Sequence, residues 1–169
     1  MRRLTCALLV TLFSTVVQAH GTTAGNAQLV ADPGNPERLA VMTQFGLVTS
    51  RDAGATWDWI CPEAVGYSDP NPAFRVSQSG HILVAHFDGM SVAPFDGCTW
   101  TSAAGLEQQS IHDLTVFENI VSAISCDVRA RSCRYHESSD GVSFAQVGVN
   151  LPDGFVATTL DVGPSRTAS

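Results

Sequence analysis

Two pairs of carboxylates have the residue types that hydrolysis of a glycosidic bond requires: Asp58 with Glu63, and Asp113 with Glu118. Such hydrolysis uses one carboxyl group as general acid and a second as base or nucleophile, held several ångströms apart. That separation depends on the fold, and nothing in the spacing of either pair specifies it. We therefore assign no catalytic residue to these acids.

Histidines offer a second kind of chemistry. If the mature chain begins at His20, its terminal amine and imidazole could chelate copper, provided that another histidine lies on the same face. The spacing nominates none of the four other histidines, so we expect no metal and no other cofactor, and we interpret the four as strand residues. They are His81, His86, His112 and His136.

The stretch from Ser50 to Trp57 reads S-x-D-x-G-x-T-W, and each fixed position suits a tight turn. The short side chains of Ser50 and Asp52 can hydrogen-bond nearby backbone N–H groups and hold a turn closed. Gly54 can adopt a backbone angle that other residues avoid. We expect Thr56 and Trp57 to begin the next strand, with the indole of Trp57 buried.

The pattern returns twice at a constant interval, because Asp52, Asp96 and Asp140 are spaced 44 residues apart. In our alignment, Ala93 and Glu137 fall at the position of the first serine, so both later copies are expected to lack it. A constant interval of this size is typical of repeat proteins, and a propeller blade takes about 40–50 residues. The alternative is that such turns are only common hairpin chemistry. The second copy comprises Asp96, Gly97, Thr99 and Trp100, and the third comprises Asp140, Gly141, Ser143 and Phe144.

This motif resembles the Asp-box, the BNR repeat of sialidases, sortilin-like receptors and photosystem II assembly-factor-like propellers. The resemblance implies an all-β fold: a partial β-propeller of about three four-stranded Asp-box blades plus the start of a fourth. It also implies that the Asp-box residues are structural and lie at the blade periphery, away from any substrate. The expected blade-like units are 27–66, 67–110 and 111–150, with 151–169 as the start of a further blade.

Short apolar runs separated by turn signals locate the expected strands, and no segment has the periodicity of a long amphipathic helix. The segment Leu160–Pro164 resembles Leu29–Pro33 and is expected to open a further blade. Closed propellers need about four to eight blades, so we expect the chain to be a fragment or a partial assembly unit. The expected strands are 29–31, 39–43, 46–50, 56–60, 74–77, 81–87, 90–93, 113–117, 119–125, 133–137 and 144–149.

Residues 1–19 have the features of a secretory signal peptide. Arg2 and Arg3 precede an apolar stretch over 7–17, which is too short to span a bilayer, and small residues precede position 20. We expect residues 20–169 to form the mature domain in a secreted or periplasmic location. A retained membrane anchor is the alternative.

Cysteine usage agrees with export. Four cysteines follow the expected signal peptide, and an even number suits an oxidising compartment. Cys126 and Cys133 flank a short expected hairpin loop and are expected to pair. That leaves Cys61 to pair with Cys98 and so tie the first blade to the second. A zinc site is the alternative, although no C-x-x-C pair supports it.

The charge balance narrows the possible partners. The chain has a net charge of -7, all nine basic residues are arginine, and no basic run is available to neutralise phosphates. We therefore expect neither nucleic acid nor an anionic membrane as a partner. Because the apolar stretch over 7–17 is too short to span a bilayer, we also expect that the chain is not an integral membrane protein. The expected function is a non-catalytic binding or scaffold module for a protein or glycan ligand, with further blades supplied by a longer chain or an oligomer.

The second expected function is a fragment of a propeller glycoside hydrolase of the exo-sialidase kind. The stretch Phe74–Ser77 resembles the F-R-I-P stretch of sialidases, in which the arginine, here Arg75, binds the substrate carboxylate. The proline of that stretch is absent. Sialidases also need a Tyr/Glu nucleophile pair, and neither Tyr67 nor Tyr135 has a glutamate that the sequence assigns to it.

Overall fold

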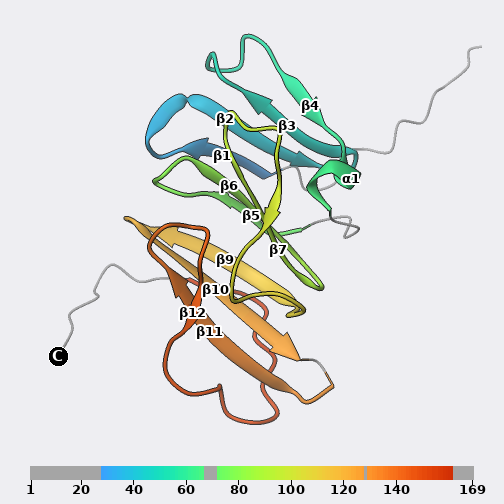
Figure 1. Cartoon of the computed structure of the whole chain (residues 1–169), viewed down its shortest axis with the longest axis vertical. Helices are drawn as coiled ribbons and strands as arrows, with labels where there is room; N and C mark the ends of the chain where they lie inside the picture. Colours follow the sequence, from blue (N-terminus) through green and yellow to red (C-terminus); the bar gives the residue numbers. More distant parts are fainter. Residues whose placement is uncertain (1–27, 67–71, 128, 162–169) are drawn as a thin grey trace, which may run out of the picture.

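The computed structural model describes residues 28–66, 72–127 and 129–161, in which the chain is almost entirely β (Figure 1). Three four-stranded antiparallel sheets follow one another along the chain, which confirms the expected all-β fold. The expected signal peptide, His20 and Tyr67 lie outside the described residues.

Each sheet is a meander in which every strand pairs with the next strand along the chain. We call the sheets blades one, two and three. Blade one contains β1 (Gln28–Asp32), β2 (Asn35–Thr43), β3 (Gly46–Ser50) and β4 (Asp58–Ile60); blade two contains β5 (Phe74–Val76), β6 (His81–His86), β7 (Gly89–Pro94) and β8 (Thr101–Ser102); blade three contains β9 (Ile111–Phe117), β10 (Ile120–Asp127), β11 (Ser132–Ser138) and β12 (Ala145–Gln146).

The outermost strands differ from expectation. Strand β4 begins at Asp58 instead of position 56, and β12 is much shorter than the expected 144–149. Blade one is followed by an unexpected one-turn helix, α1 (Pro62–Val65), which begins with a proline and ends at Gly66 with φ 88°. Proline suits the first turn of a helix and glycine suits its left-handed end, so both limits are local in origin.

The three blades lie one above another along the long axis of the molecule (Figure 1). Strand β6 explains this arrangement, because it is apolar on both faces. Ile82 and Val84 belong to the core shared with blade one, whereas Leu83 and Ala85 belong to the core shared with blade three. A strand that is covered on both faces reads as a continuous apolar run, and the sequence of β6 does so.

Blades two and three also meet through their backbones. Ala104 and Ser143 form a parallel bridge, and the amide of Phe144 donates to the carbonyl of Ala104 at 2.8 Å. Gly105 has φ 85°, and a β-carbon at this position would overlap the carbonyl oxygen of Phe144. The two backbones therefore approach more closely than a side chain at position 105 would permit.

The segment from Leu151 to Asp161 contains no strand. Leu151, Ala157 and Leu160 instead pack on a small core of blade three that contains the two cysteines of the β10–β11 hairpin. Leu160 and Asp161, expected to open a further blade, are therefore part of an irregular cover, and the rest of that expected blade lies outside the described residues.

Candidate functional site

The turn around Asp52 is closed by side-chain hydrogen bonds. Ser50 Oγ donates to Asp52 Oδ1 at 2.8 Å and accepts from the amide of Gly54 at 2.8 Å. The amide and hydroxyl of Thr56 donate to the same carboxylate at 2.8 and 2.6 Å. The bonds from Thr56, followed by that from Ser50, lower the pKa of Asp52. The carboxylate is thus fully used within its own turn.

The turn around Asp140 has the same construction. Asp140 Oδ1 accepts from Ser138 Oγ at 2.8 Å and from the amides of Val142 and Ser143 at 2.7 and 2.8 Å. The backbone bond from Ser143 is the largest cause of a pKa lowered to about 2. The first serine of the motif is therefore present as Ser138, and the alignment that placed Glu137 there was wrong by one residue.

Asp96 behaves differently from the other two aspartates. Its carboxylate forms ion pairs with Arg38 and Arg51, both of which belong to blade one. The turn itself is closed by the amide of Gly97, which donates to the carbonyl of Pro94 at 2.8 Å. Pro94 stands where the other copies have serine and has no hydroxyl to offer. Asp96 therefore joins two blades and does not close a turn with its side chain.

The three aromatic residues of the motif also differ in environment. Phe144 is 8% exposed and belongs to the core between blades two and three. Trp100 is half-buried against the core between blades one and two. Trp57 is 43% exposed, and its indole Nε1 donates to the carbonyl of Gly54 at 3.0 Å. The expected burial of Trp57 was wrong, because its ring covers the turn from outside.

Cys126 and Cys133 form a disulfide, as expected, and sit directly opposite each other in β10 and β11. The expected bond between Cys61 and Cys98 is not formed, and both are free thiols. The two residues nevertheless line the same cavity, so they lie near each other in the fold without forming a bond.

In the described residues, no group of three or more histidine, cysteine, aspartate or glutamate side chains could hold a metal ion.

The carboxylate pairs do not form a site. Asp58 lies within ion-pair distance of Arg51, and Asp113 accepts backbone amides from Leu114 and Leu160 at 2.8 Å each. Neither pair lines a common cavity among those found in the described residues. The Arg75 guanidinium donates to the carbonyl of Phe74 at 2.7 Å.

A tyrosine–glutamate pair that the sequence did not assign is present in blade three. The hydroxyl of Tyr135 donates to Glu137 Oε1 at 2.6 Å and also lies 2.8 Å from Ser122 Oγ. Tyr135 pairs in register with Ile124, a residue of the small core under the 151–161 segment. The pair therefore lies on the face of blade three that points away from blade two.

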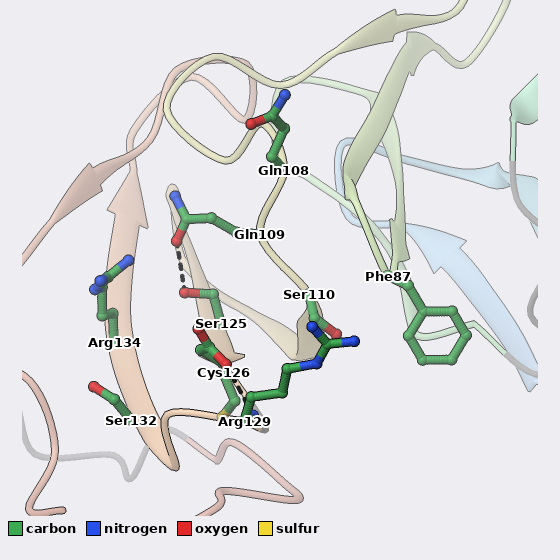
Figure 2. Close-up of a pocket in the computed structure, with 10 residues that line it drawn as sticks. Phe87, Gln108, Gln109, Ser110, Ser125, Cys126, Arg129, Ser132 and Arg134 are labelled. Carbon is green, nitrogen blue, oxygen red and sulfur yellow. Dashed lines mark hydrogen bonds between the residues drawn. The ribbon is translucent and has the colours of Figure 1, made fainter.

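A cavity of about 710 Å³ opens between blades two and three (Figure 2). Its walls come from the β6–β7 turn, the connection from β8 to β9, and the β10–β11 hairpin. We call it the arginine pocket. It is lined by Phe87, Gln108, Gln109, Ser110, Ser125, Cys126, Asp127, Arg129, Ser132 and Arg134.

The hairpin that carries the two arginines is held by two restraints beside its turn. The disulfide joins its strands, and Asp127 Oδ1 accepts the amides of Arg129 and Ala130 at 2.9 Å each. The bond from Ala130 is the largest cause of a lowered pKa at Asp127, and the charges of Arg129 and Arg134 lower it further. Among the described residues that line the pocket, the only carboxylate is thus engaged in closing its own hairpin.

A buried Ser–His pair supports the base of the pocket. Ser125 Oγ donates to Gln109 Oε1 at 2.8 Å and lies 2.9 Å from Nε2 of His136. Because the single serine proton goes to Gln109, the ring proton is assigned to Nε2. His136 Nδ1 is buried without a hydrogen-bond partner in the described residues. Burial, followed by the charge of Arg134, lowers the pKa of His136.

This pair does not have the geometry of a nucleophilic serine. In a Ser-His-Asp arrangement, Nε2 accepts the serine proton and Nδ1 donates to a carboxylate. Here Nε2 donates and Nδ1 has no carboxylate within reach. Ser125 and His136 therefore hold Gln109 and the floor of the pocket in place.

The sequence analysis missed the arginine pocket. Its signal was available as three arginines within six residues, Arg129, Arg131 and Arg134, next to the paired cysteines. The sequence alone does not show that this hairpin lies beside the β6–β7 turn of another blade, and the pocket depends on that proximity.

In the described residues, no helix is long and apolar enough to cross a bilayer.

No family model and no curated protein matches the chain. Among solved structures, the GH74 enzyme of Niastella koreensis is similar with a TM-score of 0.52 at 19% identity, over 72% of this chain and 18% of that one. The GH74 xyloglucanase of Xanthomonas campestris gives 0.47 at 19% identity, over 72% and 18%. YCF48 of Cyanidioschyzon merolae gives 0.45 at 13% identity, over 70% and 35%.

The chain therefore spans less than a fifth of the length of the two GH74 structures. An identity of 19% shows shared fold and nothing about activity. With three consecutive four-stranded antiparallel sheets, the similarity to the Niastella structure shows that the described part of this chain is a partial β-propeller.

Proposed function

We propose that this chain is a secreted or periplasmic, non-catalytic binding or scaffold module with blades of the Asp-box kind, and that it holds a protein or glycan ligand in the arginine pocket. The observation that carries the proposal is the chemistry of the pocket wall. It offers two guanidinium groups on a disulfide-clamped hairpin, and its one carboxylate, Asp127, already serves that hairpin. Hydrolysis of a glycosidic bond would need two available carboxyl groups there.

The Asp-box assignment is supported by two of the three turns. Asp52 and Asp140 each accept a serine hydroxyl and backbone amides of the same turn, although they lie in different blades. Similar hydrogen bonds at two positions separated by two repeat intervals support a common motif. The departure at Asp96 coincides with the replacement of the serine by Pro94.

A binding screen tests the proposed function. The purified mature chain is applied to an array of glycans and peptides, and the screen is repeated with Arg134→Ala and with Arg75→Ala. The second variant is a matched control, because it removes the same charge from β5 outside the pocket. We expect a ligand whose signal falls at least tenfold with Arg134→Ala, remains with Arg75→Ala, and is not cleaved. Binding that is indifferent to Arg134 would contradict the pocket as the site.

Export has its own test. N-terminal sequencing of protein recovered from outside the cytoplasm should begin at His20, because the expected signal peptide ends at position 19. Recovery of the chain in the membrane fraction with Met1 intact would contradict export.

The second candidate, a fragment of an exo-sialidase-like hydrolase, is favoured by one observation. Tyr135 and Glu137 form the kind of Tyr/Glu pair that sialidases use, with 2.6 Å between their oxygens. The pair and Arg75 come from different blades, and none of the three residues lines any of the four best-formed cavities of the described residues. Release of product from a fluorogenic sialoside, lost with Tyr135→Phe, would establish this candidate and contradict the first.

A further inference from the structure

The arginine pocket concentrates positive charge on an acidic protein. The chain has 16 acidic and nine basic residues, yet three of the nine lie on one hairpin: Arg129, Arg131 and Arg134. Arg38 and Arg51 form ion pairs with carboxylates, whereas no such pair within 4 Å is found for the three hairpin arginines in the described residues. All three residues are exposed, and guanidinium groups are well suited to binding an anion.

Two of these arginines line the same cavity. Arg134 stands on β11 opposite Ser125, next to the disulfide, and Arg129 lies within the turn that Asp127 closes. Figure 2 shows the side chain of Arg129 extending from the hairpin toward Ser110 and Phe87. Because the backbone beneath both residues is held by covalent and hydrogen bonds, binding an anion here requires little ordering of the chain.

The remaining wall suits a hydroxylated ring. Phe87 exposes 66% of its surface and offers a flat apolar face. The side chains of Gln108 and Ser110 make no hydrogen bond within the described residues, so their donors and acceptors are free for a ligand. Pockets of this kind combine an apolar surface with a few polar groups that fix orientation.

We propose that the ligand of the arginine pocket is an acidic polysaccharide, with its ring carboxylates bound by Arg129 and Arg134 and a sugar ring against Phe87. This proposal rests on the proposed function as a binding module. An acidic peptide would also satisfy the arginines. The free amide and hydroxyl groups beside an exposed aromatic ring favour the saccharide, whose ring carries several hydroxyl groups.

Isothermal titration with oligogalacturonate provides the test, because its methyl ester keeps the same ring and removes the charge. We expect the uronate to bind at least tenfold more tightly than its methyl ester, and the preference to weaken as salt rises from 50 to 500 mM. Arg129→Gln and Arg134→Gln should each reduce uronate affinity about tenfold, a loss of about 1.4 kcal/mol. Arg75→Gln should leave it unchanged, and thermal melts should show all three variants folded.

The possible outcomes distinguish the acidic-polysaccharide proposal from the more general proposal that the chain is a binding module. If the uronate and its ester bind with equal affinity, and Phe87→Ala abolishes the binding of both, the ligand need not be acidic. The proposal of a binding module would then still stand. Poly-glutamate binding as tightly as the uronate, with the same dependence on Arg129 and Arg134, would overturn the saccharide. If no oligosaccharide binds, the proposal of an acidic polysaccharide ligand is contradicted. The proposal of a binding module is contradicted only if the array screen also finds no ligand whose binding depends on Arg134.

Discussion

Strand β11 (Ser132–Ser138) joins two regions of blade three that use their polar groups in opposite ways. At its start, Ser132 and Arg134 line the arginine pocket, and the guanidinium of Arg134 makes no ion pair within the described residues. At its end, Ser138 leads into Asp140, whose carboxylate accepts three hydrogen bonds from its own turn. The two regions are only about 20 Å apart along the strand.

The difference separates stability from recognition within one blade. A polar group that is satisfied inside its own turn contributes to the free energy of folding and has little left for a ligand. A polar group that is held on a rigid frame without a partner contributes little to folding and can bind an outside molecule. Substitutions at the Asp140 end should therefore change unfolding without changing binding, and those at the Arg134 end should do the reverse.

The largest effect on unfolding is expected at the aromatic position beside the Asp140 turn. Phe144→Ala should destabilise the chain by about 3–4 kcal/mol, because it opens a cavity in the core between blades two and three. Trp57→Ala, at the equivalent position of blade one, should cost only about 1 kcal/mol, because its ring is 43% exposed. Urea unfolding of both variants measures the difference. Equal losses would contradict the different environments of the two rings.

A smaller effect is expected from the turn carboxylates. Asp140→Asn should cost about 1 kcal/mol, because it weakens three hydrogen bonds to a charged acceptor that water already screens. Asp96→Asn should cost about 0.5 kcal/mol or less, since its ion pairs with Arg38 and Arg51 are exposed. Thermal melts at low and high salt distinguish them: only the contribution of Asp96 should fade with salt. The reverse pattern would make Asp96 the turn-former.

The smallest effect is expected from pH. Burial lowers the pKa of His86 and His136, so the unfolded chain takes up protons before the folded chain does. Stability should therefore fall as pH drops through the ordinary histidine value of about 6.5. Asp140, with a pKa of about 2, contributes stability that is present above pH 3.8 and disappears only as pH approaches 2.

Melting temperatures measured from pH 8 to pH 2 should accordingly fall in two stages. His86→Gln combined with His136→Gln should remove the first stage, and Asp140→Asn should reduce the second. A first stage that persists in the double histidine variant would show that other groups titrate on unfolding near neutral pH.

The three sheets were predictable because the turns and strands of each repeat are determined by residues close together in the sequence. The turn at Asp52 depends on residues at most four positions apart, and the strands around it read as short apolar runs. The alternation of β6 between two cores likewise follows from period two. Local chemistry of this kind is visible in a sequence without knowledge of the fold.

What the sequence did not reveal depends on contacts between blades. The residues around Asp96 match the motif, yet its carboxylate forms ion pairs with arginines that lie 45 and 58 positions earlier in the chain. Trp57 and Phe144 share a motif position, but only Phe144 has a neighbouring blade over it. The arginine pocket joins Phe87 to the β10–β11 hairpin, and no periodicity predicts that proximity.

The close backbone contact between blades two and three should make Gly105 a conserved position. Its positive φ and the carbonyl of Phe144 above it together exclude every side chain, including a single methyl group. Any lineage that keeps this joint must keep the glycine, so position 105 should be invariant among homologues even where the pocket and the Asp turns diverge. A Gly105→Ala allele would force the two backbones apart and should be temperature-sensitive, with normal yields in the cold and loss of the protein on warming.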